Sequence, residues 1–395
     1  TSAVSVTGLV TVDTPTFWSP FGQAAIMAMF QIGGLGIMTA ATLLGLMVGR
    51  GFGLQDRLAT HVERGRLNLL AAPVVLRMIL AVTLSVELSV AAVLAFRFAT
   101  HWDMGIGEAL WHGLFHSVSA FNNAGFSSFS DNLMSFQGDG FILMPIALSV
   151  IISALGFPVM EDWRSHGWRW RRWTLHSKIT LSGTILLLAG GFVAMLAMEW
   201  SNPETLGPMS LSDKVLNAAF HSVMPRTAGF NSLNMGELRE ETLVINYLLM
   251  FIGGGSAGTA GGIKVTTFMV LLAIVLAEVL TRRDASMFGR RFGHAIERQA
   301  LTVASLALLL VLAATMYITS VTALPLHDVL FEAISAFATV GLSTGITAAL
   351  PNSALVVLIL LMFIGRVGTI TAATALALSG ADRRYRYPEE NPIVG

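Results

Sequence analysis

The stretch SAFATVGL (335–342) has counterparts at three other places in the chain, namely SAFNNAGF (119–126), SAVSVTGL (2–9) and the shorter MPRTAGF (224–230). In the three longer stretches a Ser-Ala pair stands six and five residues ahead of a glycine. Self-similarity that recurs along a chain indicates an architecture built from repeated structural units. We therefore predict four quasi-repeats, each marked by one glycine-containing loop.

Short, half-polar segments precede three of these loops, and we expect helices there over 106–120, 211–224 and 327–336. The sequence FHSV occurs in two of them, at 115–118 and 220–223. Such helices are too short to span a bilayer, but they are long enough to dip into it and return. Irregular backbone at membrane depth is tolerated only where it is buried or lines water. Each repeat is therefore predicted to be a helix, a pore helix, a filter loop and a second helix around a central pore.

The composition favours a lipid environment. The chain is 54% apolar and 12% charged, with a mean hydropathy of +0.69, whereas soluble domains are about 25% charged. Because the sequence contains no cysteine, disulfides and thiol chemistry are excluded. We predict an all-α integral membrane protein in which apolar runs of about 20 residues or more cross the bilayer. Seven runs qualify, and they cover 21–48, 73–98, 141–160, 179–198, 242–280, 301–321 and 354–378.

The repeats divide the chain into four regions. The predicted boundaries are 1–60 for the first repeat, 61–170 for the second, 171–290 for the third with its glycine-rich loop, and 291–395 for the fourth with a C-terminal tail. Thr1 falls inside the first predicted pore helix. We therefore expect the first repeat to be truncated at its N-terminus.

Most of the 24 lysines and arginines lie in the connectors 50–66, 164–178, 282–298 and 383–386. By the positive-inside rule these connectors are cytoplasmic and the glycine loops extracellular. The alternative, that the basic connectors bind nucleic acid, is disfavoured because spans flank them. With a net charge of zero, the chain offers no other sign of a nucleic-acid partner.

A glycine in each loop suits a pore in which four segments converge on one axis. Glycine lacks a Cβ and reaches positive φ freely, so successive carbonyls can turn inward. Rings of carbonyls replace the hydration shell of K⁺ in channel filters such as TVGYG, to which TVG (339–341) is the closest match here. Each loop has one such glycine, so we expect a shorter filter with weaker selectivity; the alternative is ordinary turn glycines. The predicted ion-binding residues are Val6, Thr7, Gly8, Asn123, Ala124, Gly125, Thr227, Ala228, Gly229, Thr339, Val340 and Gly341.

The segment 253–262 holds six glycines in the middle of the long apolar run 242–280. Each glycine costs about 1 kcal/mol relative to alanine in a helix, so we expect two half-helices, 242–251 and 265–280, joined by a mobile loop that obstructs the pore. The alternative is a helix interface packed through small residues. The candidate gate residues are Gly254, Gly255, Ser256, Gly258, Gly261, Gly262, Lys264 and Arg366.

Lys264 and Arg366 lie within predicted spans, where a charge costs about 2.5–3.5 kcal/mol and usually faces a cavity or a partner. Lys264 could instead extend to the membrane surface. Arg226 stands beside the third loop, and we expect it to brace the pore helix. His112 and His116 could share a helix face, but a zinc site needs a third ligand, and the sequence suggests none.

These motifs together resemble the Trk/Ktr/HKT superfamily of K⁺ transporters. The resemblance of the four filters rests on TGL (7–9), NAGF (123–126), PRTAGF (225–230) and TVGL (339–342). Further signatures are similar at QIGGLG (31–36), at 254–264 and at FIGRVG (363–368), and the ending 387–395 is most like that of the bacterial KtrB-type subunit.

The resemblance implies a K⁺ uptake subunit of the plasma membrane that forms a homodimer and is regulated by a cytosolic ring of nucleotide-binding RCK subunits. It implies that K⁺ is the transported ion, that no organic cofactor is bound, and that Na⁺ dependence is open. It also implies that Arg366 lies below the filter, that the glycine-rich loop is the gate, and that the C-terminal tail packs at the dimer interface.

Two other functional classes compete with an ion pore. A transporter of small organic solutes also uses broken helices, but the four pore loops and the lack of an acidic cluster within the spans favour an ion. An intramembrane enzyme is disfavoured because no Gly-x-Ser-x-Gly, His-Glu-x-x-His or Walker sequence occurs. We therefore predict that the protein is not an enzyme.

Overall fold

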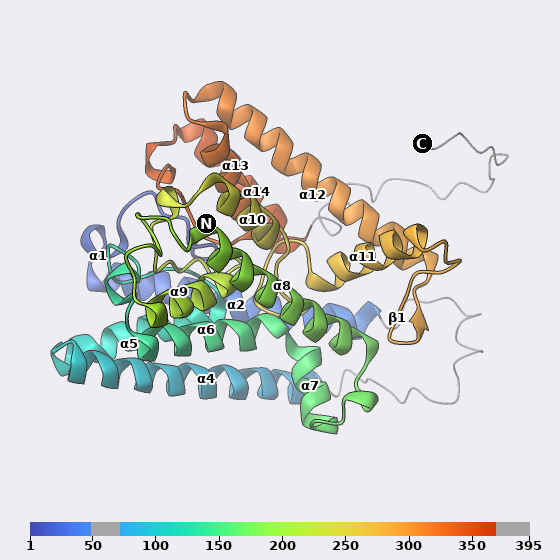
Figure 1. Ribbon diagram of the computed structural model, residues 1–395. Coiled ribbons are helices and arrows are strands. Elements are labelled where there is room, and N and C mark those ends of the chain that lie inside the picture. The colour runs from blue at the N-terminus through green and yellow to red at the C-terminus, as the bar shows by residue number, and fades with distance from the viewer. Residues whose placement is uncertain (49–71, 369–395) are drawn as a thin grey trace.

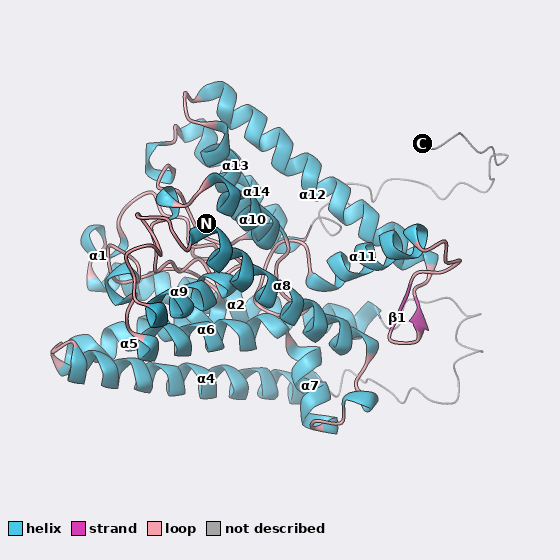
Figure 2. Cartoon of the chain, viewed as in Figure 1, coloured by secondary structure: helices cyan, strands magenta, loops and turns pink. Residues whose placement is uncertain are grey.

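The computed structural model describes residues 1–48 and 72–368, and the regular secondary structure of this part of the chain is helical except for one small hairpin (Figure 2). The hairpin pairs β1 (Ser286–Met287) with β2 (Arg290–Arg291) in antiparallel register. The predicted seventh span continues beyond Val367 into residues outside the described range, as does the C-terminal tail.

Among residues 1–48 and 72–368, four helices have the length of a membrane span. They are α2 (Pro20–Val48), α4 (Ala72–His101), α8 (Leu175–Glu199) and α12 (His294–Val321). Within the described residues, three stretches combine this length with enough apolar character to cross a bilayer: Leu76–His101, Leu175–Glu199 and His294–Val321.

The remaining helices are shorter. Helix α1 (Thr14–Phe17) precedes the long helices. Between or after them lie α5 (Ile106–Asn122), α6 (Gly140–Leu155), α7 (Phe157–His166), α9 (Leu211–Val223), α10 (Glu240–Phe251), α11 (Val265–Val279), α13 (Leu326–Ala338) and α14 (Asn352–Val367). In the described part of the chain, 3-10 turns occupy Met134–Phe136, Trp170–Arg172, Met235–Glu237 and Thr347–Ala349.

The order of a long helix, a short helix, a loop and another helix occurs three times, as α4–α5–α6, α8–α9–α10 and α12–α13–α14. Figure 1 shows the first set and the third set on opposite sides of the molecule, with α8, α9 and α10 between them. Each short helix packs against the long helix before it. A fully buried phenylalanine anchors each of the three short helices at a matching position, namely Phe115, Phe220 and Phe331.

The expected break of the run 242–280 is present. Helix α10 ends at Phe251, α11 begins at Val265, and the glycine-rich segment lies between them without helical structure. The two ends of this loop are joined by a short parallel bridge between Ile252 and Ile263.

The predicted span over 141–160 is not one straight helix, because it divides between α6 and α7. Helix α6 ends at Leu155, and the chain turns by 90° before α7. Gly156 makes the turn with φ +83°, and a methyl group at this position would lie 2.4 Å from the carbonyl oxygen of Ser256. Close contact with the glycine-rich loop therefore imposes the bend. The local apolar pattern of the sequence does not reveal this contact.

Asp139 ties the start of α6 to the end of α4. Its buried carboxylate caps α6 by accepting the Phe141 N–H at 3.0 Å, and it also accepts bonds from Arg97 Nε at 2.8 Å and Trp102 Nε1 at 3.0 Å. Burial raises the pKa of Asp139, but these hydrogen bonds and the Arg97 charge outweigh it, so the pKa lies below the usual value.

We expect Asp139→Ala to lower the free energy of unfolding by about 1–2 kcal/mol, as loss of an N-cap does. Because the folded pKa is lowered, the stabilisation is complete above the pKa of an unfolded aspartate, about 3.9, and is lost as the pH falls through the folded pKa. Unfolding in detergent between pH 3 and 7 measures this, with the exposed Glu278→Ala as control. A difference between wild type and Asp139→Ala that does not shrink at low pH would contradict the assignment.

Candidate functional site

The four glycine loops meet in a closed ring. A methyl group at Gly8 would lie 3.3 Å from Gly125 Cα, and one at Gly125 would lie 2.8 Å from Gly229 Cα. The ring continues with 3.2 Å from a methyl group at Gly229 to Gly341 Cα, and it closes with 3.0 Å from a methyl group at Gly341 to Gly8 Cα. The structure thus brings together four positions that are far apart in the sequence. A side chain larger than hydrogen would force the loops apart.

The backbone repeats the same conformation around the ring. Each ring glycine has positive φ, and so has the residue two positions earlier, although that residue is never glycine. The φ angles are 55° at Val6, 58° at Asn123, 72° at Thr227 and 51° at Thr339, against 97° at Gly8, 68° at Gly125, 72° at Gly229 and 94° at Gly341. Non-glycine residues adopt this region at a cost and cluster at functional sites.

In each loop one residue lies between these two positive-φ positions. Its carbonyl oxygen lies against the ring glycine of a neighbouring loop, and this is so in all four loops. A methyl group placed on Gly341 would lie 2.1 Å from the Thr7 carbonyl oxygen, and one placed on Gly8 would lie 2.5 Å from that of Ala124. The same distance is 2.8 Å from Gly125 to the Ala228 oxygen and 2.4 Å from Gly229 to the Val340 oxygen. The four carbonyls are therefore arranged in one rotational sense about a common axis.

The serine of the Ser-Ala pair holds each longer loop. Ser2 Oγ accepts the Gly8 N–H at 3.1 Å, and Ser335 Oγ accepts the Gly341 N–H at the same distance. In the second loop Ser119 Oγ donates to the Phe126 carbonyl at 2.8 Å. The repeated serine thus has a physical role, because it satisfies backbone groups that the extended loop leaves unpaired.

In two of the loops, a side chain of the short helix also forms a hydrogen bond with a residue that follows the ring glycine. His116 Nε2 bonds Ser127 Oγ at 2.9 Å, whereas Glu332, which occupies the matching position in the fourth repeat, accepts from Thr347 Oγ1. Ser343, which matches Ser127, bonds Thr347 at 3.0 Å. Glu332 is not among the predicted site residues, although it stands three residues before Ser335 just as His116 stands three residues before Ser119.

The two histidines considered for zinc have other partners. His112 Nδ1 bonds Ser128 Oγ at 2.6 Å, and His116 Nδ1 contacts the His112 carbonyl at 2.8 Å. Within residues 1–48 and 72–368, no group of three or more potential metal-ligating side chains occurs.

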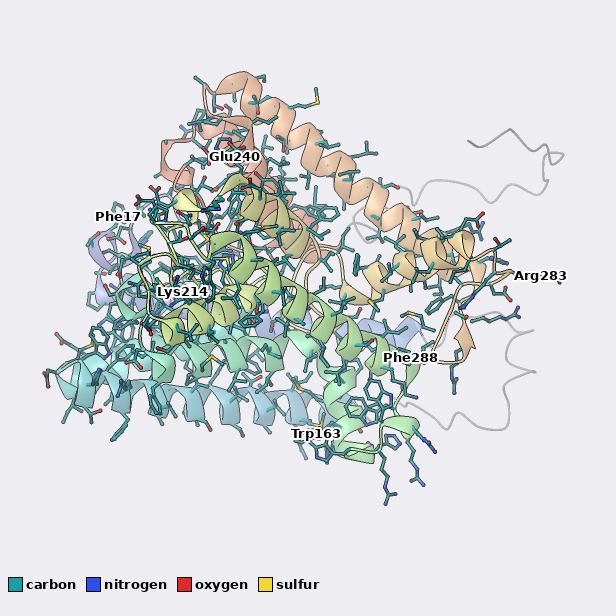
Figure 3. All side chains as sticks on the ribbon, viewed as in Figure 1. Phe17, Trp163, Lys214, Glu240, Arg283 and Phe288 are labelled. Carbon is teal, nitrogen blue, oxygen red and sulfur yellow. The ribbon has the colours of Figure 1, made fainter. Side chains whose placement is uncertain are left out.

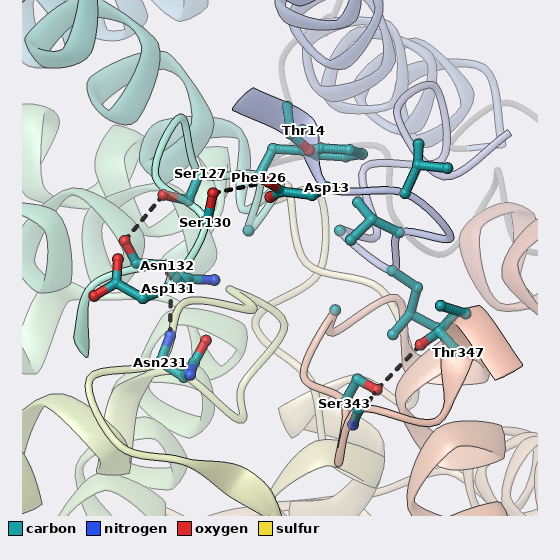
Figure 4. Close-up of a pocket in the computed structure, with 18 of the residues that line it drawn as sticks. Asp13, Thr14, Phe126, Ser127, Ser130, Asp131, Asn132, Asn231, Ser343 and Thr347 are labelled. Atoms are coloured by element: carbon teal, nitrogen blue, oxygen red, sulfur yellow. Dashed lines mark hydrogen bonds between the residues drawn. The ribbon is translucent and has the colours of Figure 1, made fainter. Parts of the chain in front are cut away.

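A polar cavity of 370 Å³ opens on one side of the ring. Its lining includes Gly8, Gly125 and Gly341 together with Asp13 and Asp131. Figure 4 shows Asp13 beside Ser130, which donates to its carboxylate at 2.7 Å. Carboxylates at the mouth of a narrow cavity concentrate cations there.

The glycine-rich loop lies on the opposite side of the ring. The cavity is lined by the ring glycines and the residues that follow them, whereas the loop contacts residues that precede them. A methyl group at Gly261 would lie 2.1 Å from Thr339 Oγ1, and one at Gly253 would lie 3.3 Å from Thr227 Cγ2. The glycine-rich loop therefore lies directly against two of the four loops, and Gly261 is the candidate gate residue that contacts Thr339.

Three cations bond this loop, and two of them, Arg226 and Arg366, are buried. Arg366 donates through Nη1 to the Thr259 carbonyl, and Lys264 Nζ donates to the Ala260 carbonyl. Arg226 Nη2 reaches the Gly253 carbonyl at 3.4 Å and Thr184 Oγ1 at 3.4 Å. The partners of Arg226 thus lie on the loop and on α8, not on the short helix that the sequence analysis expected it to brace.

The loop is also bonded to the bend between α6 and α7. The Gly255 N–H donates to the Ala154 carbonyl at 2.7 Å, and the Phe157 N–H donates to the Ala257 carbonyl at 3.3 Å. These contacts satisfy backbone groups that neither helix can pair internally.

With this geometry in view, comparisons with known proteins identify the family. The family model described as TrkH, cation transport protein, matches residues 1–384. The chain belongs to the TrkH family of cation transport proteins. It is 39% identical over 394 residues to the Ktr system potassium uptake protein B of Bacillus subtilis (strain 168), covering 100% of this chain and 88% of that protein. The potassium/sodium uptake protein NtpJ of Enterococcus hirae is 36% identical over 402 residues, with the same coverage of 100% and 88%.

The fold agrees with this assignment. The crystal structure of the potassium transporter TrkH from Vibrio parahaemolyticus superposes with a TM-score of 0.74 at 19% identity, over 95% of this chain and 76% of that one. As a member of a family of cation transporters, the protein is not an enzyme.

One buried carboxylate in this TrkH-family protein was missed from the sequence. Glu87, in the middle of α4, is 4% exposed and accepts from Gln31 Nε2 at 3.3 Å and Asn122 Nδ2 at 3.2 Å. The predicted spans contain no acidic cluster, and the single residue Glu87 was therefore not named as a candidate. An acidic residue inside an apolar run was the available signal, since such residues usually have a buried partner.

Two motif glycines of this TrkH-family protein allow the helices after the loops to approach closely. A methyl group at Gly33 in α2 would lie 2.0 Å from the Val4 carbonyl oxygen, and one at Gly365 in α14 would lie 1.6 Å from the Phe337 carbonyl oxygen. Val4 and Phe337 each precede their ring glycine by four residues. The similar motifs at 31–36 and 363–368 therefore set the same contact beside the first and fourth glycine loops.

We expect Gly365→Ala to destabilise the protein by about 1–3 kcal/mol, as overpacking does, and to displace the fourth loop. Gly190→Ala is the matched control, because no atom lies within 4 Å of a methyl group at that position of α8. Unfolding in detergent measures both variants. Equal stability of Gly365→Ala and Gly190→Ala would show that α14 does not pack on the Phe337 carbonyl.

Proposed function

We propose that this protein is the ion-conducting membrane subunit of a K⁺ uptake system. The observation that carries the proposal is the ring of four glycines, in which four carbonyls are arranged about one axis. Carbonyl rings of this kind replace the water around a dehydrated cation. The assignment to K⁺ is supported by the relatives that are named potassium uptake proteins.

In this proposal the ion passes between the loops and is coordinated by their backbone oxygens. The acidic cavity beside Asp13 and Asp131 is the outer mouth, and the basic connectors face the cytoplasm. Na⁺ acts as a coupled or competing cation, a role for which the name of the potassium/sodium relative gives support. The twelve filter residues are Val6, Thr7, Gly8, Asn123, Ala124, Gly125, Thr227, Ala228, Gly229, Thr339, Val340 and Gly341.

The glycine-rich loop is the gate in this proposal. Gly261 touches Thr339, so the loop stands at the inner end of the fourth pore loop. Arg366 and Lys264 bond carbonyls of the loop and place positive charge beside it. Small residues let such a loop move aside with little steric cost, while its bonds to Ala154 and Phe157 couple it to the α6–α7 bend.

The working assembly in this proposal is a homodimer of the chain in the plasma membrane, bound to a cytosolic ring of RCK subunits. The description of relatives as parts of a Ktr system supports the presence of a further component. Binding of nucleotide to the ring would move the α6–α7 bend or the hairpin of β1 and β2, and through them the loop.

Replacing Gly8, Gly125, Gly229 or Gly341 by serine places a side chain where the loops approach most closely, so the carbonyl ring must widen. We expect each variant to lower the K⁺/Na⁺ flux ratio by about tenfold or more, which corresponds to about 1.4 kcal/mol of lost discrimination. Flux in proteoliposomes and growth of K⁺-uptake-deficient cells measure the effect. Gly190→Ser, on the open side of α8, is the control. Unchanged discrimination in all four ring variants would refute the filter assignment.

Deleting residues 256–261 removes the part of the loop that contacts the fourth pore loop. We expect higher K⁺ flux that no longer depends on the regulatory partner or its nucleotide, because nothing remains to obstruct the pore. Flux in proteoliposomes, with and without the partner, measures this, and Gly190→Ala should stay partner-dependent. Partner-dependent flux of the wild-type size in the deletion protein would mean that the loop is not the gate.

A further inference from the structure

An open apolar groove of 1190 Å³ lies on the outside of the second repeat, away from the ring. Helices α4, α6, α7 and α8 all contribute to it. Its walls are formed by aliphatic and methionine side chains, among them Ala81, Val86 and Ile152. The filter and the glycine-rich loop do not account for this surface.

The rim of the groove differs from its walls. Arg77 near the start of α4 and Arg164 in α7, which contacts the neighbouring Met78, line the groove together with the exposed Trp163 and Trp168. Figure 3 shows Trp163 at the α7 corner of the molecule, beside the start of α4. Tryptophan collects at the boundary between headgroups and hydrocarbon, so this end of the groove lies at a membrane surface.

The two arginines have little to bind within the protein. Arg164 Nη1 donates to Met78 Sδ at 2.9 Å, and a thioether is a weak acceptor. Across residues 1–48 and 72–368, neither arginine forms an ion pair with a carboxylate. Both are exposed, and both have guanidinium groups suited to bidentate bonds with a phosphate.

The length of the groove fits one lipid leaflet. From Arg77 to Val86 helix α4 rises about 14 Å, at 1.5 Å per residue, which is about half of the 30 Å hydrocarbon core of a bilayer. A ligand with its charge at the rim and apolar chains about one leaflet long would satisfy both parts of the groove.

From these observations we propose that the groove is a specific binding site for an anionic phospholipid, with Arg77 and Arg164 on the phosphodiester and the acyl chains along α4 and α6. Basic pockets between membrane helices bind anionic headgroups in this way. The bound lipid bridges α4 to α7 and therefore stabilises the α6–α7 bend. This inference does not depend on the pore or the gate.

Purified protein is tested in detergent with phosphatidylglycerol and, separately, phosphatidylcholine. Native mass spectrometry counts the retained lipid, and thermal unfolding reports stabilisation. We expect wild type to retain phosphatidylglycerol in preference to phosphatidylcholine and to unfold at a higher temperature with it. The double variant Arg77→Gln/Arg164→Gln should lose about tenfold or more in affinity, at roughly 1 kcal/mol per arginine.

Two further variants separate this site from general attraction to a basic surface. Ala81→Trp fills the groove without changing charge, and it should also abolish retention. Arg283→Gln/Arg290→Gln removes two exposed arginines elsewhere and should retain lipid as wild type does.

Three results would overturn the proposal. The first is equal retention by all variants, which would indicate adsorption to the surface. The second is the same stabilisation by inorganic phosphate alone, which would identify a free anion as the ligand. The third is no retained lipid in wild type, which would indicate that the groove does not bind phospholipid.

Discussion

The arrangement depends on one steric constraint, the approach of four loop backbones to a single axis. At Gly125 the Cα of Gly229 is 2.8 Å from the place of a missing methyl group. Only glycine permits this contact, and only glycine adopts the accompanying positive φ without cost. The carbonyls of Thr7, Ala124, Ala228 and Val340 can line up around the axis because the glycines leave them room.

The constraint extends outward from the ring. Loops that carry irregular backbone inside a helical protein must have their polar groups satisfied, and here the serines of the Ser-Ala pairs do this in three loops. Helices α5 and α13 carry Ser119 and Ser335, and the buried Phe115 and Phe331 anchor these two helices. Gly33 and Gly365 then bring α2 and α14 against the carbonyls of Val4 and Phe337. The packing of the helices thus fixes the position of the loops, and the loops fix the position of the ring glycines.

Much of this could be predicted from the sequence because its causes are local or repeated. The length of the apolar runs predicted the long helices, and six glycines in 253–262 predicted the break between α10 and α11. The turn at Gly156 could not be predicted, since it results from contact with Ser256, about a hundred residues further along the chain. The partners of Glu87 and Arg226 were hidden for the same reason, because a single charged residue in an apolar run does not identify the distant groups that bond it.

The central claim is that the ring of carbonyls coordinates a dehydrated K⁺. The most direct measurement is anomalous scattering from crystals in which Rb⁺ or Tl⁺ replaces K⁺. Our account predicts a peak on the ring axis, within coordinating distance of the carbonyl oxygens of Thr7, Ala124, Ala228 and Val340, and loss of that peak when Na⁺ replaces the heavier ion. Anomalous peaks confined to the acidic cavity around Asp13 and Asp131, with none at the ring, would contradict it.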